Sequence, residues 1–233
     1  MNEKSRSLLV PLLIGLLLAP LLIAQAALGQ GTTEVPPVEI EIARGDGDVT
    51  VDGVLDESAW SGAAVIELPV RLYRPRPEAS DLSGRFRAFW REEGLYVGIE
   101  VRDEALVLAS DPTTLWDYDS AEVWIHNLWL QVSADPEGGT LLRWMFTNGA
   151  RVHVPEPRAA VVKGADRYTV ELFVPAALFN AAAGVDLGEG GEFRFAVGLR
   201  DRDEGEREAA SPLYFPPRFG WNNVESMAVA TLR

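Results

Sequence analysis

Short segments in which apolar and polar residues alternate recur along most of this chain of 233 residues. The first, VEIEI at 38–42, places three apolar side chains on one side of an extended backbone and two glutamates on the other. A repeat of two residues is typical of a half-buried β-strand, whereas an amphipathic helix repeats every three or four. The chain is therefore predicted to be all-β.

Two such segments, at 84–91 and 94–103, are expected to pair as a hairpin. In the first segment Phe86, Ala88 and Trp90 share one face. Glu92 and Glu93 lead into Gly94, and a glycine in a short hairpin turn commonly supplies a positive φ angle. We expect Gly94 to have this role.

The alternation returns at 140–148, 158–164, 167–175, 192–201 and 227–233, with turn-forming residues between the segments. Residues 115–132 are expected to form one further strand and its lead-in. Many short strands with almost no helical periodicity indicate an antiparallel β-sandwich, immunoglobulin-like or jelly-roll-like. Short helical turns are expected at 56–60 and 175–180, and Pro212, Pro216 and Pro217 are expected in loops.

The N-terminal segment has the pattern of an export signal. Lys4 and Arg6 precede a long apolar run that ends in Ala24-Gln25-Ala26, a small-x-small cleavage pattern. We expect a signal peptide at 1–26, a flexible leader at 27–37 and one domain at 38–233. The alternative is an uncleaved membrane anchor, because about 20 apolar residues can span a bilayer. Either reading places the domain outside the cytoplasm: secreted, periplasmic or in the cell envelope.

The charge and the absence of cysteine narrow the possible partners. With 35 acidic against 21 basic residues, the formal net charge is −14. This sign disfavours nucleic acid, because nucleic-acid binding depends on neutralising phosphates. It is compatible with Ca²⁺, which prefers oxygen ligands, although an acidic surface also simply keeps a secreted domain soluble. Because the chain has no cysteine, no disulfide stabilises the fold.

Common catalytic patterns are absent from the sequence. It contains no GxSxG turn for a serine nucleophile and no HExxH zinc motif. His126 and His153 lie in apparently regular strand or strand-edge segments, where a packed or surface histidine is expected. Paired carboxylates leave a glycosidase formally open, but no pair stands out from the acidic background. We therefore expect a binding module rather than an enzyme.

Two of the seven tryptophans have polar loop neighbours. Trp116 follows DPTT, and Trp221 lies between Gly220 and two asparagines. An indole in such a loop is a stacking surface for a pyranose ring, whose C–H face meets the π-cloud while its hydroxyls seek polar groups. The alternative is that both rings cap the edge of the fold. Trp60 and Trp90 are expected in the core.

Three segments together resemble carbohydrate-binding modules of family 9. They are VDGVLDESAW at 51–60, GLYVGIEVRD at 94–103 and LWDYDSAEVWIH at 115–126, and the closing WNNVESMAVATLR resembles the last loop and strand of that family. The resemblance implies a β-sandwich that binds a saccharide without catalysis, often beside glycoside-degrading enzymes. It also implies two clamping tryptophans, which match Trp116 and Trp221, and a hydroxyl-binding glutamate, which matches Glu122. Arg143 is matched weakly as a further polar contact.

Calcium is the cofactor that this resemblance implies, as a structural ion. The most acidic loop is DRDEGE at 201–206, and we expect its ligands to be Asp201, Asp203 and Glu204. The competing interpretation of this loop is a solvated turn.

Two other functions stay open at this stage. Related sandwiches of the DOMON type hold a b-type haem between axial ligands such as Met with His or Lys. Here Met145 and Met227 with His126 and His153 could supply them. The third possibility is a structural module of the cell envelope that binds a partner protein and no small ligand.

Overall fold

Strand β1 (Glu39–Arg44) pairs with two strands that follow it far along the chain. In the computed structural model, which describes residues 36–72 and 74–233, its first four residues run parallel to β12 (Ala228–Leu232). Its last two residues run parallel to β3 (Leu82–Arg91). Strand β1 therefore joins the two halves of the sheet.

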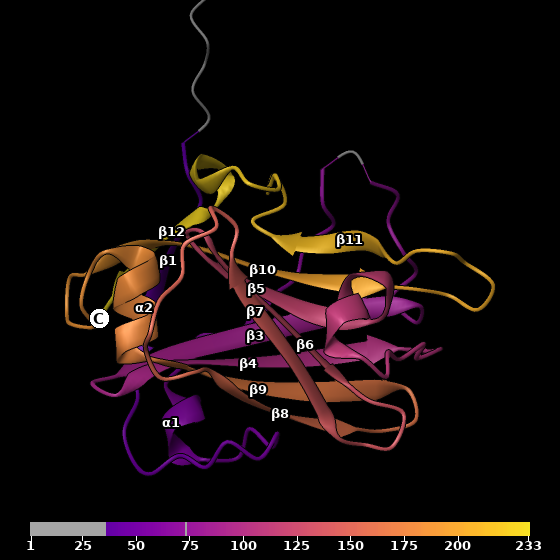
Figure 1. The fold of residues 1–233 in the computed structure, drawn as a ribbon, viewed down its shortest axis with the longest axis horizontal. Helices are drawn as coiled ribbons and strands as arrows, with labels where there is room; N and C mark the ends of the chain where they lie inside the picture. The colour runs from indigo at the N-terminus through magenta and orange to yellow at the C-terminus, as the bar shows by residue number, and fades with distance from the viewer. Residues whose placement is uncertain (1–35, 73) are drawn as a thin grey trace, which may run out of the picture. The chain divides into compact units, whose positions relative to one another are not determined.

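The described strands form one nearly closed sheet, in which every other strand pairing is antiparallel. Its order is β7-β6-β5-β10-β12-β1-β3-β4-β9-β8, with β11 beside β10 and β2 beside β3. The strands at the two ends of this order, β7 and β8, approach each other (Figure 1). A hydrogen bond joins them: the Val161 amide of β8 donates to Thr140 Oγ1 of β7 at 2.9 Å. The remaining strands are β2 (Ile66–Glu67), β4 (Gly94–Asp103), β5 (Ser120–Ile125), β6 (Leu128–Ala134), β7 (Thr140–Phe146), β8 (Arg158–Lys163), β9 (Arg167–Pro175), β10 (Glu192–Asp201) and β11 (Ala210–Phe215).

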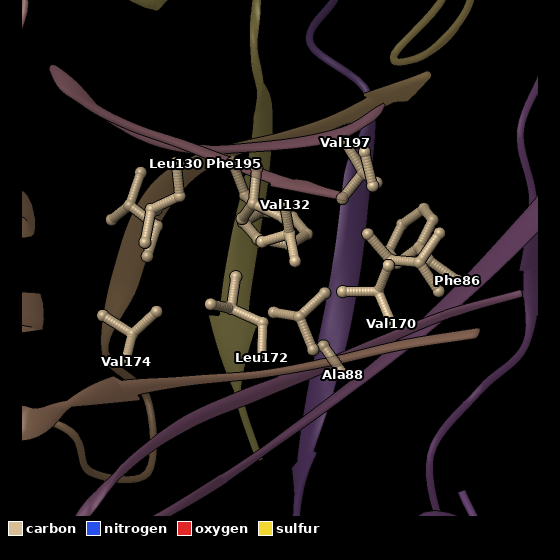
Figure 2. Packing of buried hydrophobic residues seen from close by; sticks show 14 of the residues in the cluster. Phe86, Ala88, Leu130, Val132, Val170, Leu172, Val174, Phe195 and Val197 are labelled. Atoms are coloured by element: carbon tan, nitrogen blue, oxygen red, sulfur yellow. The ribbon is translucent and has the colours of Figure 1, made fainter. Parts of the chain in front are cut away.

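The mostly β prediction is confirmed, and the finer description as a sandwich stays a prediction. The alternating residues point as expected: Phe86, Val170 and Phe195 are each at most 1% exposed. Figure 2 shows these side chains packed together between strands of the two halves of the sheet. Burying one large apolar side chain contributes roughly 1.5–3 kcal/mol, so this core supplies most of the stability of a fold without disulfides.

The β3–β4 hairpin is confirmed, but the expected role of its glycine is wrong. Gly94 is the first residue of β4, and it is not among the described residues with a positive φ angle. A Cβ atom at this position would lie 2.3 Å from the ring of Phe173 and 2.5 Å from the carbonyl oxygen of Val174. The glycine therefore permits close packing of β9 against the turn.

Residues 115–132 form two strands, not one. A 3₁₀ turn, η1 (Pro112–Asp117), leads into β5, and β6 follows after a turn at His126 and Asn127. His126 has a φ angle of +50°, which places it in the left-handed region and outside any strand. His153 is exposed and also lies outside the strands. His126 thus lies at the edge of β5, where its amide donates to the carbonyl oxygen of Arg194, whereas the strand or strand-edge placement expected for His153 was wrong.

The short helices lie close to the predicted positions: α1 (Ser58–Ser61) and α2 (Ala176–Ala183), with a further 3₁₀ turn, η2 (Val224–Ser226). Pro212 contradicts its loop prediction because it lies inside β11. There the pairing with β10 shifts register, and on the other side β11 has one isolated bridge, between Leu213 and Val70, so the missing amide of the proline is tolerated at a bulge.

The first family-like motif is held by two carboxylates, of which Glu171 is buried and Glu57 is half-buried. Glu171 Oε2 of β9 accepts the backbone amides of Asp52 and Gly53 at 2.9 and 3.0 Å. Glu57 accepts the backbone amide of Thr50 and the indole N–H of Trp60. Trp60 is 1% exposed and Trp90 5%, which confirms both as core residues.

The predicted signal peptide at 1–26 lies outside the described residues. So does the predicted leader at 27–37, except for its last two residues. Within the described part of the chain, no helix has the length and apolar character needed to cross a membrane.

Candidate functional site

Four neighbouring strands place one row of residues side by side. Gly198 of β10, Glu122 of β5, Gln131 of β6 and Arg143 of β7 are cross-strand partners, so their side chains emerge on the same face of the sheet. The residues that alternate with them belong to the main core. This row, the polar row, therefore lies on the outer face of β10, β5, β6 and β7.

Glu122 is fully buried within this row. Its Oε1 accepts a hydrogen bond from Gln131 Nε2 at 3.0 Å and lies 3.7 Å from Arg200 Nη1. Its Oε2 has no hydrogen-bond partner among the described residues, and neither has Gln131 Oε1. Burial raises the pKa of Glu122 to about 7, although Arg200, Trp129, Gln131 and Arg71 act in the opposite direction.

Two unpaired buried acceptors side by side are costly, at about 1–3 kcal/mol each. Such a pair is suited to accept hydroxyl protons from a ligand that reaches the polar row. A sugar presents several adjacent hydroxyl donors, so the chemistry of this row matches that ligand class.

A cluster of aromatic rings adjoins the polar row. Trp124 and Trp129, the next residues on this face, stack at 5.5 Å with an interplanar angle of 20°. Trp221 meets both rings edge-on, at 5.4 and 5.8 Å. Trp124 is buried, whereas Trp221 keeps 37% of its surface exposed. We call Trp124, Trp129 and Trp221 the tryptophan cluster.

Trp116 lies on η1, where the Asp111 carboxylate accepts the Thr113 amide at 2.7 Å and fixes the start of the turn. Trp116 as a residue is also 37% exposed. The guanidinium carbon of Arg143 lies 4.4 Å from the Trp116 ring centroid and 5.4 Å from that of Trp129. Arg143 therefore links Trp116 to the tryptophan cluster.

The four predicted saccharide-binding residues, Trp116, Glu122, Arg143 and Trp221, thus belong to one connected region. Ring contacts among the described residues do not include Trp116 with Trp221; Arg143 and Trp129 connect them. A clamp formed by the two indole planes stays a prediction.

Sequence reasoning missed several members of this region. Gln131 was recognisable in principle, because it and Ser133 are the polar residues of an otherwise apolar strand. Arg200 gives no local signal of its position beside Glu122. Arg71 also gives no local signal of its position in this region. Its Nε donates to the carbonyl oxygen of Phe219 at 3.2 Å, a contact between residues 148 positions apart in the sequence.

The predicted metal ligands separate into two groups. Asp201 gathers with Asp103 and Asp119, and within that group the ligand atoms all lie within 4.8 Å of one another. Asp203 gathers in the same way with Asp81 and Glu104. Glu204 is exposed and belongs to neither group.

The first group, which we call the aspartate triad, fits a calcium ion. Asp103 and Asp119 are 2% and 0% exposed, and Asp103 Oδ2 has no hydrogen-bond partner among the described residues. Burial, followed by repulsion between neighbouring carboxylates, raises the pKa of Asp119 to about 8 and that of Asp201 to about 7. Burial likewise raises the pKa of Asp103 to about 6. A hard cation would offset this repulsion and use the carboxylate oxygens as ligands.

The sequence model described as "Carbohydrate family 9 binding domain-like" matches residues 51–233. The chain belongs to this family. The match covers all three motifs that suggested the resemblance, and it includes the polar row, the tryptophan cluster and the aspartate triad.

Solved structures of family 9 modules share the fold. A module from Caldicellulosiruptor kristjanssonii in complex with cellotriose has a TM-score of 0.61 at 15% identity, covering 84% of this chain and 93% of its own. A family 9 module from the same organism in complex with glucose gives 0.61 at 16% identity, covering 84% and 95%. A putative carbohydrate-binding protein from Bacteroides uniformis gives 0.61 at 11% identity, covering 85% and 100%. No curated protein matches the sequence.

Neither the family nor these structures support the haem alternative. In this family 9 domain His126 Nε2 already accepts the backbone amide of Arg194 at 3.1 Å. Met227 is buried beside the tryptophan cluster, and Met145 is exposed on β7.

Proposed function

We propose that this family 9 domain is a secreted, non-catalytic module that binds a saccharide on the polar row, with the exposed rings of Trp116 and Trp221 as its walls. One observation carries the proposal: Glu122 Oε2 and Gln131 Oε1 are buried acceptors without described partners, in the same region as two tryptophan residues that are each 37% exposed. Sugar hydroxyls would satisfy the acceptors while ring C–H groups stack on the indoles.

The neighbouring structures support this assignment of ligand class. The Caldicellulosiruptor modules are complexes with cellotriose and with glucose, and their fold covers 84% of this chain. By analogy with base stacking, each stacked ring is worth about 1–3 kcal/mol, so the affinity expected from two rings and a few hydrogen bonds is modest. Modest affinity suits a module that holds a partner enzyme near a polysaccharide.

Export and calcium complete the proposal. The apolar N-terminal run with its Ala24-Gln25-Ala26 pattern supports secretion. The aspartate triad supports a structural Ca²⁺ held by Asp103, Asp119 and Asp201, which lie at the end of β4, just before β5 and at the end of β10. An ion there would tie both halves of the sheet together, which is useful to a fold without disulfides.

The test is retention on insoluble polysaccharides, followed by a glycan array. Trp116→Ala and Trp221→Ala should each abolish retention while leaving the β-type circular dichroism unchanged, because both side chains are partly exposed. Val162→Ala, an exposed apolar residue of β8, serves as the surface control and should bind normally. Unchanged retention in both tryptophan variants, or no binding of the wild type to any glycan, would refute the proposal; the latter result would favour a structural module.

A further inference from the structure

Arginines gather on the proposed saccharide face of this acidic chain, each over an aromatic ring. Arg143 lies over Trp116 at 4.4 Å, and Arg200 lies over Trp221 at 5.6 Å. The same arrangement places Arg71 over Tyr214 at 5.5 Å and Arg202 over Tyr118 at 4.7 Å. Arg202 lies between Asp201 and Asp203, and its backbone amide donates to Asp119, so it brings no excess charge; in a chain with 35 acids and 21 bases, the gathering of the other three arginines needs an explanation.

Carboxylates do not neutralise these guanidinium groups as they do on the other half of the sheet. There, Arg85 and Arg87 bind Glu100 at 2.8 and 2.9 Å. Arg143 instead donates to the carbonyl oxygen of Thr113 and to the sulfur of Met145. It forms no ion pair with a described residue.

Arg71 and Arg202 follow the same rule. Arg71 donates to the carbonyl oxygen of Phe219, and Arg202 donates to the carbonyl oxygens of Asp117 and Glu206. Neither forms an ion pair with a described side chain. Arg143 and Arg71 keep their planes in place by stacking and by backbone contacts, so their charge stays available.

Arg194, on the same face of β10, is paired with Glu225 at 2.7 Å, but among the four arginines over rings only Arg200 is paired with a carboxylate, and that carboxylate is a poor counter-charge. Glu122 lies 3.7 Å from Arg200, but burial raises its pKa to about 7, so near neutral pH it carries only part of a negative charge. Burial first, then the neighbouring Arg74, lowers the pKa of Arg71; Glu122 acts in the opposite direction, and Arg200 adds a smaller lowering effect. Arginines that lie close together repel one another, and this repulsion costs free energy. Their gathering therefore indicates that they bind an anionic group of a ligand.

A planar guanidinium binds a carboxylate or sulfate through two parallel hydrogen bonds, which a neutral hydroxyl cannot match. The buried acceptors Glu122 Oε2 and Gln131 Oε1, in contrast, suit hydroxyl groups. Resting on the function proposed above, we propose that the ligand of the polar row is an anionic saccharide, a uronate or a sulfated sugar, with its acidic group on the arginines and its hydroxyls on Glu122 and Gln131.

The test compares three trisaccharides that share one β-1,4-linked backbone: cellotriose, its counterpart with carboxylates at C6, and its 6-sulfated counterpart. Calorimetric titration of the full chain at low salt should give about tenfold tighter binding for at least one anionic ligand, the gain expected from one charge-assisted hydrogen bond. The preference should shrink at high salt. The carboxylated and sulfated arms identify which acidic group is recognised.

Arg143→Gln and Arg71→Gln should each reduce the preference for the anionic ligand several-fold. Arg85→Gln, which breaks an ion pair on the other half of the sheet, is the matched control and should keep the preference. Equal or tighter binding of cellotriose would overturn the anionic ligand and leave the saccharide function standing. If none of the three ligands binds and the glycan array is also empty, the saccharide function itself fails.

Discussion

The guanidinium carbon of Arg143 lies 4.4 Å from the ring centroid of Trp116 and thereby connects η1 to the outer face of β7. An exposed cation–π contact of this kind is worth about 0.5–1 kcal/mol. A saccharide that stacks on Trp116 must use the ring surface that Arg143 leaves free. The orientation of the proposed ligand wall thus depends on an arginine from a different strand.

Replacing Arg143 with alanine should therefore mobilise Trp116. We expect fivefold to tenfold weaker saccharide binding and more efficient quenching of tryptophan fluorescence by acrylamide, because η1 loses both the stacking and the bond to the Thr113 carbonyl. Calorimetry and quenching measure the two effects. Unchanged values for both would show that the contact does not position Trp116, and Arg85→Ala is the control on the opposite half of the sheet.

Glu122 should give the stability of the protein a specific pH dependence. A carboxyl whose pKa rises from 4.5 to about 7 on folding keeps its proton in the folded state while the unfolded state ionises. The contribution of Glu122 to stability is therefore fully present below pH 4.5, falls as the pH rises through this window, and is lost above about pH 7. The loss is at most roughly 3 kcal/mol.

Glu122→Gln removes this titration while keeping the shape and the oxygen that accepts from Gln131. The difference in unfolding free energy between variant and wild type, measured by urea denaturation at pH values from 4.5 to 8, should grow with pH in favour of the variant. Contributions of other carboxyls are common to both proteins and cancel. A difference that stays constant across this range would show that Glu122 is not protonated in the folded protein.

Calcium should stabilise the protein through the aspartate triad. At a free Ca²⁺ concentration of about 100 times Kd, binding contributes about 2.7 kcal/mol, which corresponds to a rise in Tm of roughly 5–10 °C for a domain of this size. Asp201→Asn should abolish the rise and, in the presence of a chelator, should melt at or above the wild-type temperature because it removes one of three crowded carboxylates.

Glu204→Gln is the control for this experiment, since Glu204 lies outside both carboxylate groups. It should respond to Ca²⁺ as the wild type does. If Asp201→Asn shows the full rise, or if the wild type shows none in a scanning calorimeter, the triad is not a calcium site.

Gly198 occupies a place in the polar row where no side chain fits. A Cβ atom there would lie 2.3–2.4 Å from ring atoms of Tyr214, which is fully buried. Gly198→Ala should cost about 1–3 kcal/mol in urea denaturation, because the ring must shift. Gly188→Ala meets nothing within 4 Å and should be close to neutral. Equal stability of the two variants would contradict the packing of Tyr214 on β10.

The strands with one buried face could be predicted, because their apolar and polar residues alternate along the sequence. Ile42 and Phe195 illustrate this: each is an apolar position in a regular polar–apolar pattern, and each is buried. The boundary between β5 and β6 was missed for the opposite reason. Trp124 and Trp129 bury the outer face as well, since Trp221 covers them, so no alternation is left to mark the turn.

The candidate site was only partly predictable. Motif resemblance identified Trp116, Glu122 and Trp221, which lie in two local segments. The partners of Asp201 and the arginines over the rings depend on long-range register. Asp103 and Asp119 are brought to Asp201 by the ends of separate strands, and nothing near residue 201 in the sequence indicates them. Charge pattern alone therefore favoured the adjacent Asp203 and Glu204.

The central claim is that a saccharide binds on the outer face of β5, β6 and β7. Its most direct test is the difference electron density of crystals grown with a saturating oligosaccharide that the array identifies. The account predicts a sugar ring against Trp116 or Trp221, with hydroxyl oxygens within hydrogen-bond distance of Glu122 Oε2 and Gln131 Oε1. Density on any other face, with the polar row empty, would contradict it.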